Sequence, residues 1–289
     1  MLAPVFFLAP TPPPPQMLEL ASALPPPAEA LRQAKDWAGL ADWFEAQTPA
    51  VRGRHFETWL QALQKSQRWG RLVEICDALQ PQLEATSGPR LGSYRFYRAR
   101  SLSGLGRHAE AAAAHAENGR LGDPDGFSNA CTEARLGMAW PALLAYAEAL
   151  LIQRPENGLG LAWKGEALAR LERFSEAEPV LKAALAKDPT IAYAWNNLGR
   201  CLNERKAWGE AAAALDQALA LDPGQLEALF NRGRARFELK QYVGSRDDFR
   251  AALALEPDNL VLAENLRQAE RYAALPAGPS PGRKGTKSK

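Results

Sequence analysis

The sequence predicts an all-α chain built from helix pairs that repeat about every 34 residues. Three markers share that period: prolines at 155, 189, 223 and 257, glycines at 165, 199 and 233, and alanines at 184, 218 and 252. No alternation of polar and apolar residues, the sign of a half-buried β-strand, accompanies them. A fixed period of this length is typical of a repeat protein, in which each unit packs only against its neighbours.

Residues 192–225 give the clearest unit. Trp195, Leu198 and Leu202 follow i, i+3, i+7 spacing and form the apolar stripe of a first helix. Gly199 lies within that stripe, where a missing side chain lets a second helix come close. The second helix carries a matching stripe at Ala211, Leu215, Ala218 and Leu219, and Asp222-Pro223-Gly224 ends it because proline cannot continue a helix.

Trp195-x2-Leu198-Gly199-x2-Leu202, followed by Ala211-x3-Leu215 and Pro223, resembles the tetratricopeptide repeat, with Leu in place of its Tyr and Phe. The resemblance implies a right-handed α-solenoid whose first helices line a concave groove that holds a partner's peptide. The chaperone-binding members use a carboxylate clamp, and its first-helix Lys and Asn have no match at Ala162 and Glu166. That specialised role is therefore not expected here.

The same rhythm continues outside the clearest unit. Second helices are expected to start at residues 37, 69, 108, 140, 174, 208 and 242, which gives about seven pairs. The best repeats are 158–191, 192–225 and 226–259, and a polar closing helix at 260–274 follows them. The expected solenoid covers 28–274.

The two ends differ from this middle. Residues 1–27 hold nine prolines and are expected to be a disordered or polyproline arm, and 275–289 a flexible basic tail. The apolar start could instead be an export or membrane-associating segment, or translation could begin at Met17. Three scattered cysteines favour a reducing compartment, so a cytoplasmic location is the main expectation.

Composition and motifs offer little for catalysis. The chain has 289 residues, and 46% of them are hydrophobic, which is enough to form a core. Its formal net charge of only +2 gives no indication that the protein binds a polyanion such as nucleic acid. It contains no phosphate-binding loop, HExxH or CxxC motif, and its three histidines are too few for a typical metal or acid–base site. His108 and His115, on one helix face, are expected at the surface or groove edge. We therefore expect no enzyme activity, no catalytic residue, no metal site and no cofactor.

One basic segment suggests an alternative function. Between Glu84 and Glu110 there is no acidic residue, and three aromatic residues, Tyr94, Phe96 and Tyr97, interleave with arginines. Such a mixture can bind single-stranded nucleic acid through phosphate contacts and stacking, or it can pack between repeats. The arginines are Arg90, Arg95, Arg98, Arg100 and Arg107.

A second set of polar residues recurs with the repeat on the first helices, opposite their apolar stripe. Asn in such a row can hydrogen-bond an extended backbone and Arg can meet an acidic group, or Arg and Glu can simply neutralise each other at i, i+4. The candidate groove residues are Trp163, Tyr193, Asn197, Arg200, Glu227, Asn231, Arg234 and Asn265.

These observations favour a non-enzymatic scaffold or adaptor. It would hold an extended peptide or helix of a protein partner in its groove and help assemble a multiprotein complex. The alternative is a nucleic-acid or polyanion binder that uses the arginines between 90 and 107. No membrane span is expected, because no stretch is long and apolar enough.

Overall fold

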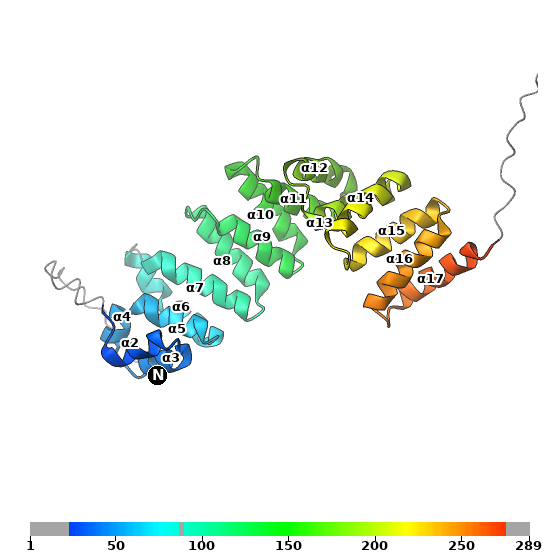
Figure 1. The fold of residues 1–289 in the computed structure, drawn as a ribbon. Helices are drawn as coiled ribbons and strands as arrows, with labels where there is room; N and C mark the ends of the chain where they lie inside the picture. Colours follow the sequence, from blue (N-terminus) through cyan, green and yellow to red (C-terminus); the bar gives the residue numbers. More distant parts are fainter. Residues whose placement is uncertain (1–22, 87–89, 276–289) are drawn as a thin grey trace, which may run out of the picture. The chain divides into compact units, whose positions relative to one another are not determined.

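A computed structural model describes residues 23–86 and 90–275, and within them the chain forms 16 helices and no strand (Figure 1). The N-terminal helices are α2 (Pro26–Gln33), α3 (Trp37–Glu45), α4 (Pro49–Arg54), α5 (Phe56–Lys65), α6 (Trp69–Thr86), α7 (Arg90–Gly104), α8 (His108–Arg120) and α9 (Gly126–Leu136). The C-terminal helices are α10 (Trp140–Gln153), α11 (Gly158–Arg170), α12 (Phe174–Lys187), α13 (Ala192–Glu204), α14 (Trp208–Leu221), α15 (Leu226–Glu238), α16 (Tyr242–Leu255) and α17 (Leu260–Ala273). The all-helical fold class is confirmed.

The chain divides into two compact units between Ala139 and Trp140. In the N-terminal unit, core residues run from Ala28 on α2 to Tyr94 on α7. In the C-terminal unit, α11 to α17 pack in chain order, each against the next, and α13 also contacts α11 and α15. This succession of helix pairs is the architecture expected for a solenoid.

Helices begin at all seven of the expected second-helix starts, from Trp37 to Tyr242. The four helices that precede the periodic prolines, α10, α12, α14 and α16, each end two residues before the proline. The closing helix α17 ends at Ala273, and α4 is a short extra helix that the repeat pattern did not predict.

The expected terminal segments lie mostly outside the described residues, which begin at 23 and end at 275. At the N-terminal side, α2 starts at Pro26, within the expected arm of 1–27, and Ala28 is fully buried. Proline is well placed there, because the first turn of a helix leaves its backbone N–H groups unpaired in any case.

The turn inside each helix pair has one repeated backbone conformation. Two residues before every second helix, the chain takes a positive φ between 52° and 71°, at Lys35, Gln67, Gly106, Met138, Glu172, Lys206 and Lys240. Six of these seven residues are not glycine, although the left-handed region costs an L-residue about 1–2 kcal/mol. The same strained turn therefore marks helix pairs in both units.

Close helix packing explains the periodic glycines. A Cβ added at Gly199 would lie 2.4 Å from Leu215 Cγ, and one at Gly165 would lie 2.6 Å from Leu181. At Gly233 it would lie 2.7 Å from the Phe249 ring. The prediction that Gly199 admits the second helix is confirmed, and the same holds one repeat before and after it.

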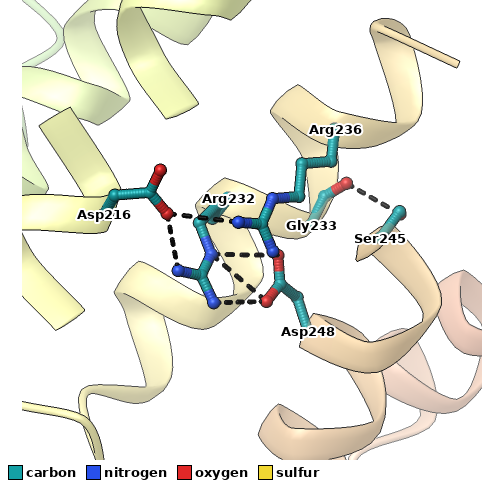
Figure 2. A network of polar contacts seen from close by, with 6 residues as sticks. All are labelled: Asp216, Arg232, Gly233, Arg236, Ser245 and Asp248. Carbon is teal, nitrogen blue, oxygen red and sulfur yellow. Dashed lines mark hydrogen bonds and ion pairs between the residues drawn. The ribbon is translucent and has the colours of Figure 1, made fainter. Parts of the chain in front are cut away.

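A buried polar network holds α15 against α14 and α16 (Figure 2). Asp248, only 3% exposed, accepts hydrogen bonds from Arg232 at 2.6 Å and from Arg236 at 2.9 Å. Asp216 on α14 accepts from the same two arginines at 2.7 and 3.2 Å. Burial lowers the pKa of Arg232, but the hydrogen bonds and charges of Asp248 and Asp216 outweigh it and leave the pKa raised.

Candidate partner-binding face

The candidate face lies on the first helices of the C-terminal unit, α11, α13, α15 and α17. We call it the first-helix face and define it by the polar rows that repeat from α13 onward. On α13 the rows contain Tyr193, Asn197, Arg200 and Glu204; on α15, Glu227, Asn231, Arg234 and Glu238; on α17, Asn265 and Gln268.

One chain of contacts ties three first helices together. The Arg170 guanidinium, at the end of α11, lies 5.2 Å from the Trp140 ring centre and donates to both carboxylate oxygens of Glu227 on α15 at 2.8 Å. Asn196 of α13 donates to the same carboxylate at 3.1 Å, and Asn231 donates to Asn196 at 3.1 Å. Glu227 therefore serves the fold, by bridging α11 to α15 across α13.

The asparagines of the rows are less accessible than a helical wheel suggests. Asn197 is 1% exposed and its amide donates to the Tyr193 carbonyl at 2.9 Å, one turn back on its own helix. Asn231 is 6% exposed, and its own backbone carbonyl accepts from Asn203 at 2.9 Å. These two side chains lie below the surface, so a partner's backbone could reach them only after the helices rearranged.

The arginines of the rows stay partly exposed. Arg200 lies over the Phe174 ring with its guanidinium carbon 5.5 Å from the ring centre. Arg234 makes a long contact of 3.4 Å with Glu204 on the neighbouring first helix. The neutralising partner of Arg234 is thus across the face and not at i, i+4. Both guanidinium groups remain within reach of an acidic group that approaches this face.

A pocket opens at the C-terminal end of the face, between α15 and α17. It encloses about 180 Å³, with three aromatic side chains and four polar ones around it. The aromatic residues are Trp208, Phe237 and Phe249, and the polar residues are Arg234, Glu238, Asn265 and Gln268. Arg234 and Asn265 are thus the two predicted groove residues that the structure brings together at a cavity.

The other two predicted groove residues belong largely to the core. Trp163 on α11 is 8% exposed. Tyr193 is half-buried and packs against the core cluster that includes Ala162 and Leu198. A direct contact between the predicted residues and a partner stays a prediction; Glu227 is the most exposed of them, and Arg200, Arg234 and Asn265 are partly exposed.

Sequence reasoning did not find the aromatic floor of the pocket. The sequence shows Trp208 one repeat after Phe174 and one before Tyr242, which marks it as a repeated structural position. Phe237 and Phe249 come from two different helices of one pair, and only the fold brings them to the same cavity. No sequence spacing signals that arrangement.

Two of the arginines between 90 and 107 pair with carboxylates. Arg98 pairs with Asp77 at 2.7 Å and Arg107 with Glu110 at 2.6 Å. Arg95 is half-buried beside two hollows, and Arg100 is exposed. Arg90 begins α7, but its side chain is not among those described.

Histidine and cysteine residues offer no metal site within the described ranges, where no group of three or more His, Cys, Asp or Glu side chains could hold an ion. Cys76, Cys131 and Cys201 are unpaired and buried, and burial raises the pKa of each thiol to about 12. His115 is only 6% exposed, so its expected place at the surface is wrong. His108 lies closer to solvent, with Nδ1 2.9 Å from Glu133 Oε2.

Comparison with known families decides what kind of repeat this is. The profile of the tetratricopeptide repeat family matches residues 142–190, 164–225 and 208–259, which overlap to cover 142–259. Residues 142–259 are tetratricopeptide repeats. The matches include all three periodic glycines, at 165, 199 and 233.

Several solved structures are similar to parts of this chain. The MamA RS-1 ArsTM double mutant is 20% identical, covers 59% of this chain and 96% of its own, and has a TM-score of 0.51. TTC0263, a thermophilic tetratricopeptide repeat protein of Thermus thermophilus, is 20% identical over 62% of this chain and 99% of its own, with a TM-score of 0.47. The first tetratricopeptide repeat domain of human RPAP3 is 26% identical over 42% of this chain and 94% of its own, with a TM-score of 0.38.

Two searches found nothing, one for curated relatives and one, in the described part of the chain, for membrane-spanning helices. No curated protein matches the chain. Among the helices of residues 23–86 and 90–275, none combines the length and the apolar character that crossing a membrane requires.

Proposed function

We propose that the C-terminal unit binds a segment of a partner protein on its first-helix face and that the chain acts as a non-enzymatic scaffold or adaptor in a multiprotein complex. The observation that carries the proposal is the pocket between α15 and α17, which lies within the tetratricopeptide repeats and their closing helix. The three buried, unpaired cysteines support a cytoplasmic setting for this role.

The pocket fits one side chain of a peptide better than a small-molecule substrate. Its volume of about 180 Å³ is below the ~300–1,000 Å³ of a typical ligand site. Phe237 and Phe249 offer an apolar floor for a buried side chain, while Asn265 and Gln268 at the rim can hydrogen-bond a backbone. Arg234 places a positive charge and Glu238 a negative charge beside it, so an apolar residue with an acidic neighbour on the Arg234 side fits the site best.

Site-specific photo-cross-linking tests this assignment. A photoreactive benzoylphenylalanine replaces Gln268 at the pocket rim, and in a control protein it replaces Gln217, an exposed residue of second helix α14. In extract from the source cells, the Gln268 probe should form an adduct with a protein that the Gln217 probe does not touch. Equal adducts from both positions, or none from Gln268, would contradict the proposal.

Reversing two charges on the same face provides a second test of the proposal. Arg200→Glu combined with Arg234→Glu should reduce that adduct about tenfold or more, because an attraction becomes a repulsion. The fold should survive, since both side chains are partly exposed and surface changes cost about 0.5 kcal/mol each. Trp195→Ala, which removes a side chain packed between two core clusters, serves as the control for loss of fold.

A further inference from the structure

Arg95 on α7 lies between two hollows of the N-terminal unit, and both are lined by Arg95 and Asn118. The larger encloses about 340 Å³ and the smaller about 110 Å³. Gly92, Leu121, Gly122 and Asp123 complete the larger hollow; Gln80, Tyr94, Arg98, Ala114 and Glu117 complete the smaller.

The charge of Arg95 is not neutralised as that of its neighbours is. Arg98, one turn along the helix, pairs with Asp77 at 2.7 Å, and Arg107 pairs with Glu110 at 2.6 Å. Within the described residues, Arg95 has no ion pair and no side-chain hydrogen bond. A half-buried guanidinium beside an open hollow therefore has its donors available to a ligand.

Asn118 adds a second donor from the opposite helix, α8. Its side chain is 7% exposed, and the described part of the chain supplies no hydrogen-bond partner for its amide. Asn118 lines both hollows, so its side-chain amide can donate a hydrogen bond to a ligand that enters either of them. Arg95 and Asn118 together present donors suited to a carboxylate, which has two acceptor oxygens.

The surroundings favour a protein carboxylate over a nucleic-acid backbone. Asp123 lines the larger hollow and Glu117 the smaller, so a row of phosphates would bring several negative charges against them, whereas a single carboxylate brings only one. The aromatic residues do not form an open stacking surface either, because Tyr94 is 2% exposed and Tyr97 is half-buried, which leaves Phe96, at 45%, as the one fully exposed ring of the three.

We propose that the Arg95–Asn118 hollows bind an acidic side chain, Asp or Glu, of a partner protein. This second contact point lies wholly within the N-terminal unit and does not depend on the first-helix face. Gly92 leaves room for a peptide to approach, since a Cβ placed there would meet nothing within 4 Å.

Fluorescence anisotropy with the full-length protein tests the proposal. The probe is a short fluorescein-labelled peptide of alternating Glu and Ser, and the comparison probe carries Gln in place of Glu. Arg95→Ala should weaken binding of the acidic peptide about tenfold, the loss of a charge-assisted contact of about 1.4 kcal/mol. The matched control, Arg100→Ala, removes the same charge from an exposed position on the same helix that lines neither hollow, and should change binding by less than about twofold.

A third variant separates the hollow from the general field of the arginines. Gly92→Leu fills the larger hollow but keeps every charge, and it should also weaken binding about tenfold without lowering the thermal midpoint. Equal losses for Arg95→Ala and Arg100→Ala, or unchanged binding by Gly92→Leu, would overturn the proposal. So would tighter binding of a labelled oligothymidylate than of the acidic peptide, which would instead favour a nucleic-acid surface.

Discussion

Asp248 and Asp247 are neighbours in sequence with opposite environments, and this contrast gives a test at the scale of single residues. Asp248 is 3% exposed between Arg232 and Arg236, whereas the Asp247 side chain is 54% exposed beside Arg246. Asp248→Ala leaves two half-buried guanidinium groups short of acceptors and should cost ~3–5 kcal/mol of unfolding free energy. Asp247→Ala should cost less than ~1 kcal/mol.

Urea unfolding followed by circular dichroism measures both values. Similar losses for the two variants would mean that the network in Figure 2 does not hold α15 in place.

His115 gives the protein a dependence on pH. Burial lowers the pKa of this imidazole below its usual 6.5, an effect that outweighs the opposing charges of Glu133 and Asp123. Near pH 6.5, the imidazole of His115 is protonated in the unfolded chain and stays neutral in the folded one. The contribution of His115 to the free energy of unfolding is therefore fully present above that pH and is lost as the pH falls below it.

Unfolding free energies measured between pH 7.5 and 5.5 check the sign and the residue. His115→Gln should flatten the slope by up to ~1.4 kcal/mol per pH unit. His55, whose pKa burial also lowers, accounts for part of the slope that remains. A slope that His115→Gln leaves unchanged would exclude this account of the acid sensitivity.

At the scale of helices, two glycines of one helix pair should respond in opposite directions to the same substitution. Gly199→Ala places a Cβ 2.4 Å from Leu215, and the repacking should cost about 1–2 kcal/mol after the gain in helix propensity. Gly209 on α14 has nothing within 4 Å of its Cβ position, so Gly209→Ala should stabilise by about 0.5 kcal/mol. Thermal melts of both variants measure the contrast, and a stabilised Gly199→Ala would refute the close-packing role of the periodic glycines.

The helices also show which features the sequence could predict. The starts at Trp37 to Tyr242 and the ends before the periodic prolines were predictable, because each depends on local residue types and on one period. The positive φ at Glu172, Lys206 and Lys240 was not, since no glycine marks these turns. Tertiary packing imposes that conformation on residues that do not favour it.

The polar rows of the first helices were predictable from the repeat period, but the burial of their asparagines was not. A helical wheel places Asn197 and Asn231 on the polar side of their helices. It cannot show that Asn231 of α15 is held in a buried network by hydrogen bonds with Asn196 and Asn203 of α13. It likewise could not show that the Glu227 carboxylate pairs with the Arg170 guanidinium, because the two residues are 57 positions apart in the sequence. Contacts between repeats decide which polar residues stay free.

At the scale of the whole molecule, the two compact units lead to a prediction about folding. Two core clusters of the C-terminal unit lie entirely between Leu144 and Leu262. A protein of residues 140–289 should therefore fold alone, with a helical circular dichroism spectrum and one cooperative thermal transition. A non-cooperative melt of this fragment would show that its repeats need the N-terminal unit.

Hydrogen exchange in the presence of the partner captured by cross-linking tests the central claim most directly. If a segment of that partner lies on the first-helix face, backbone amides of α13, α15 and α17 should gain protection, because binding suppresses local opening of the helices it covers. The second helices α12, α14 and α16 should change much less. Protection confined to the second helices, or absent from the C-terminal unit altogether, would contradict the account.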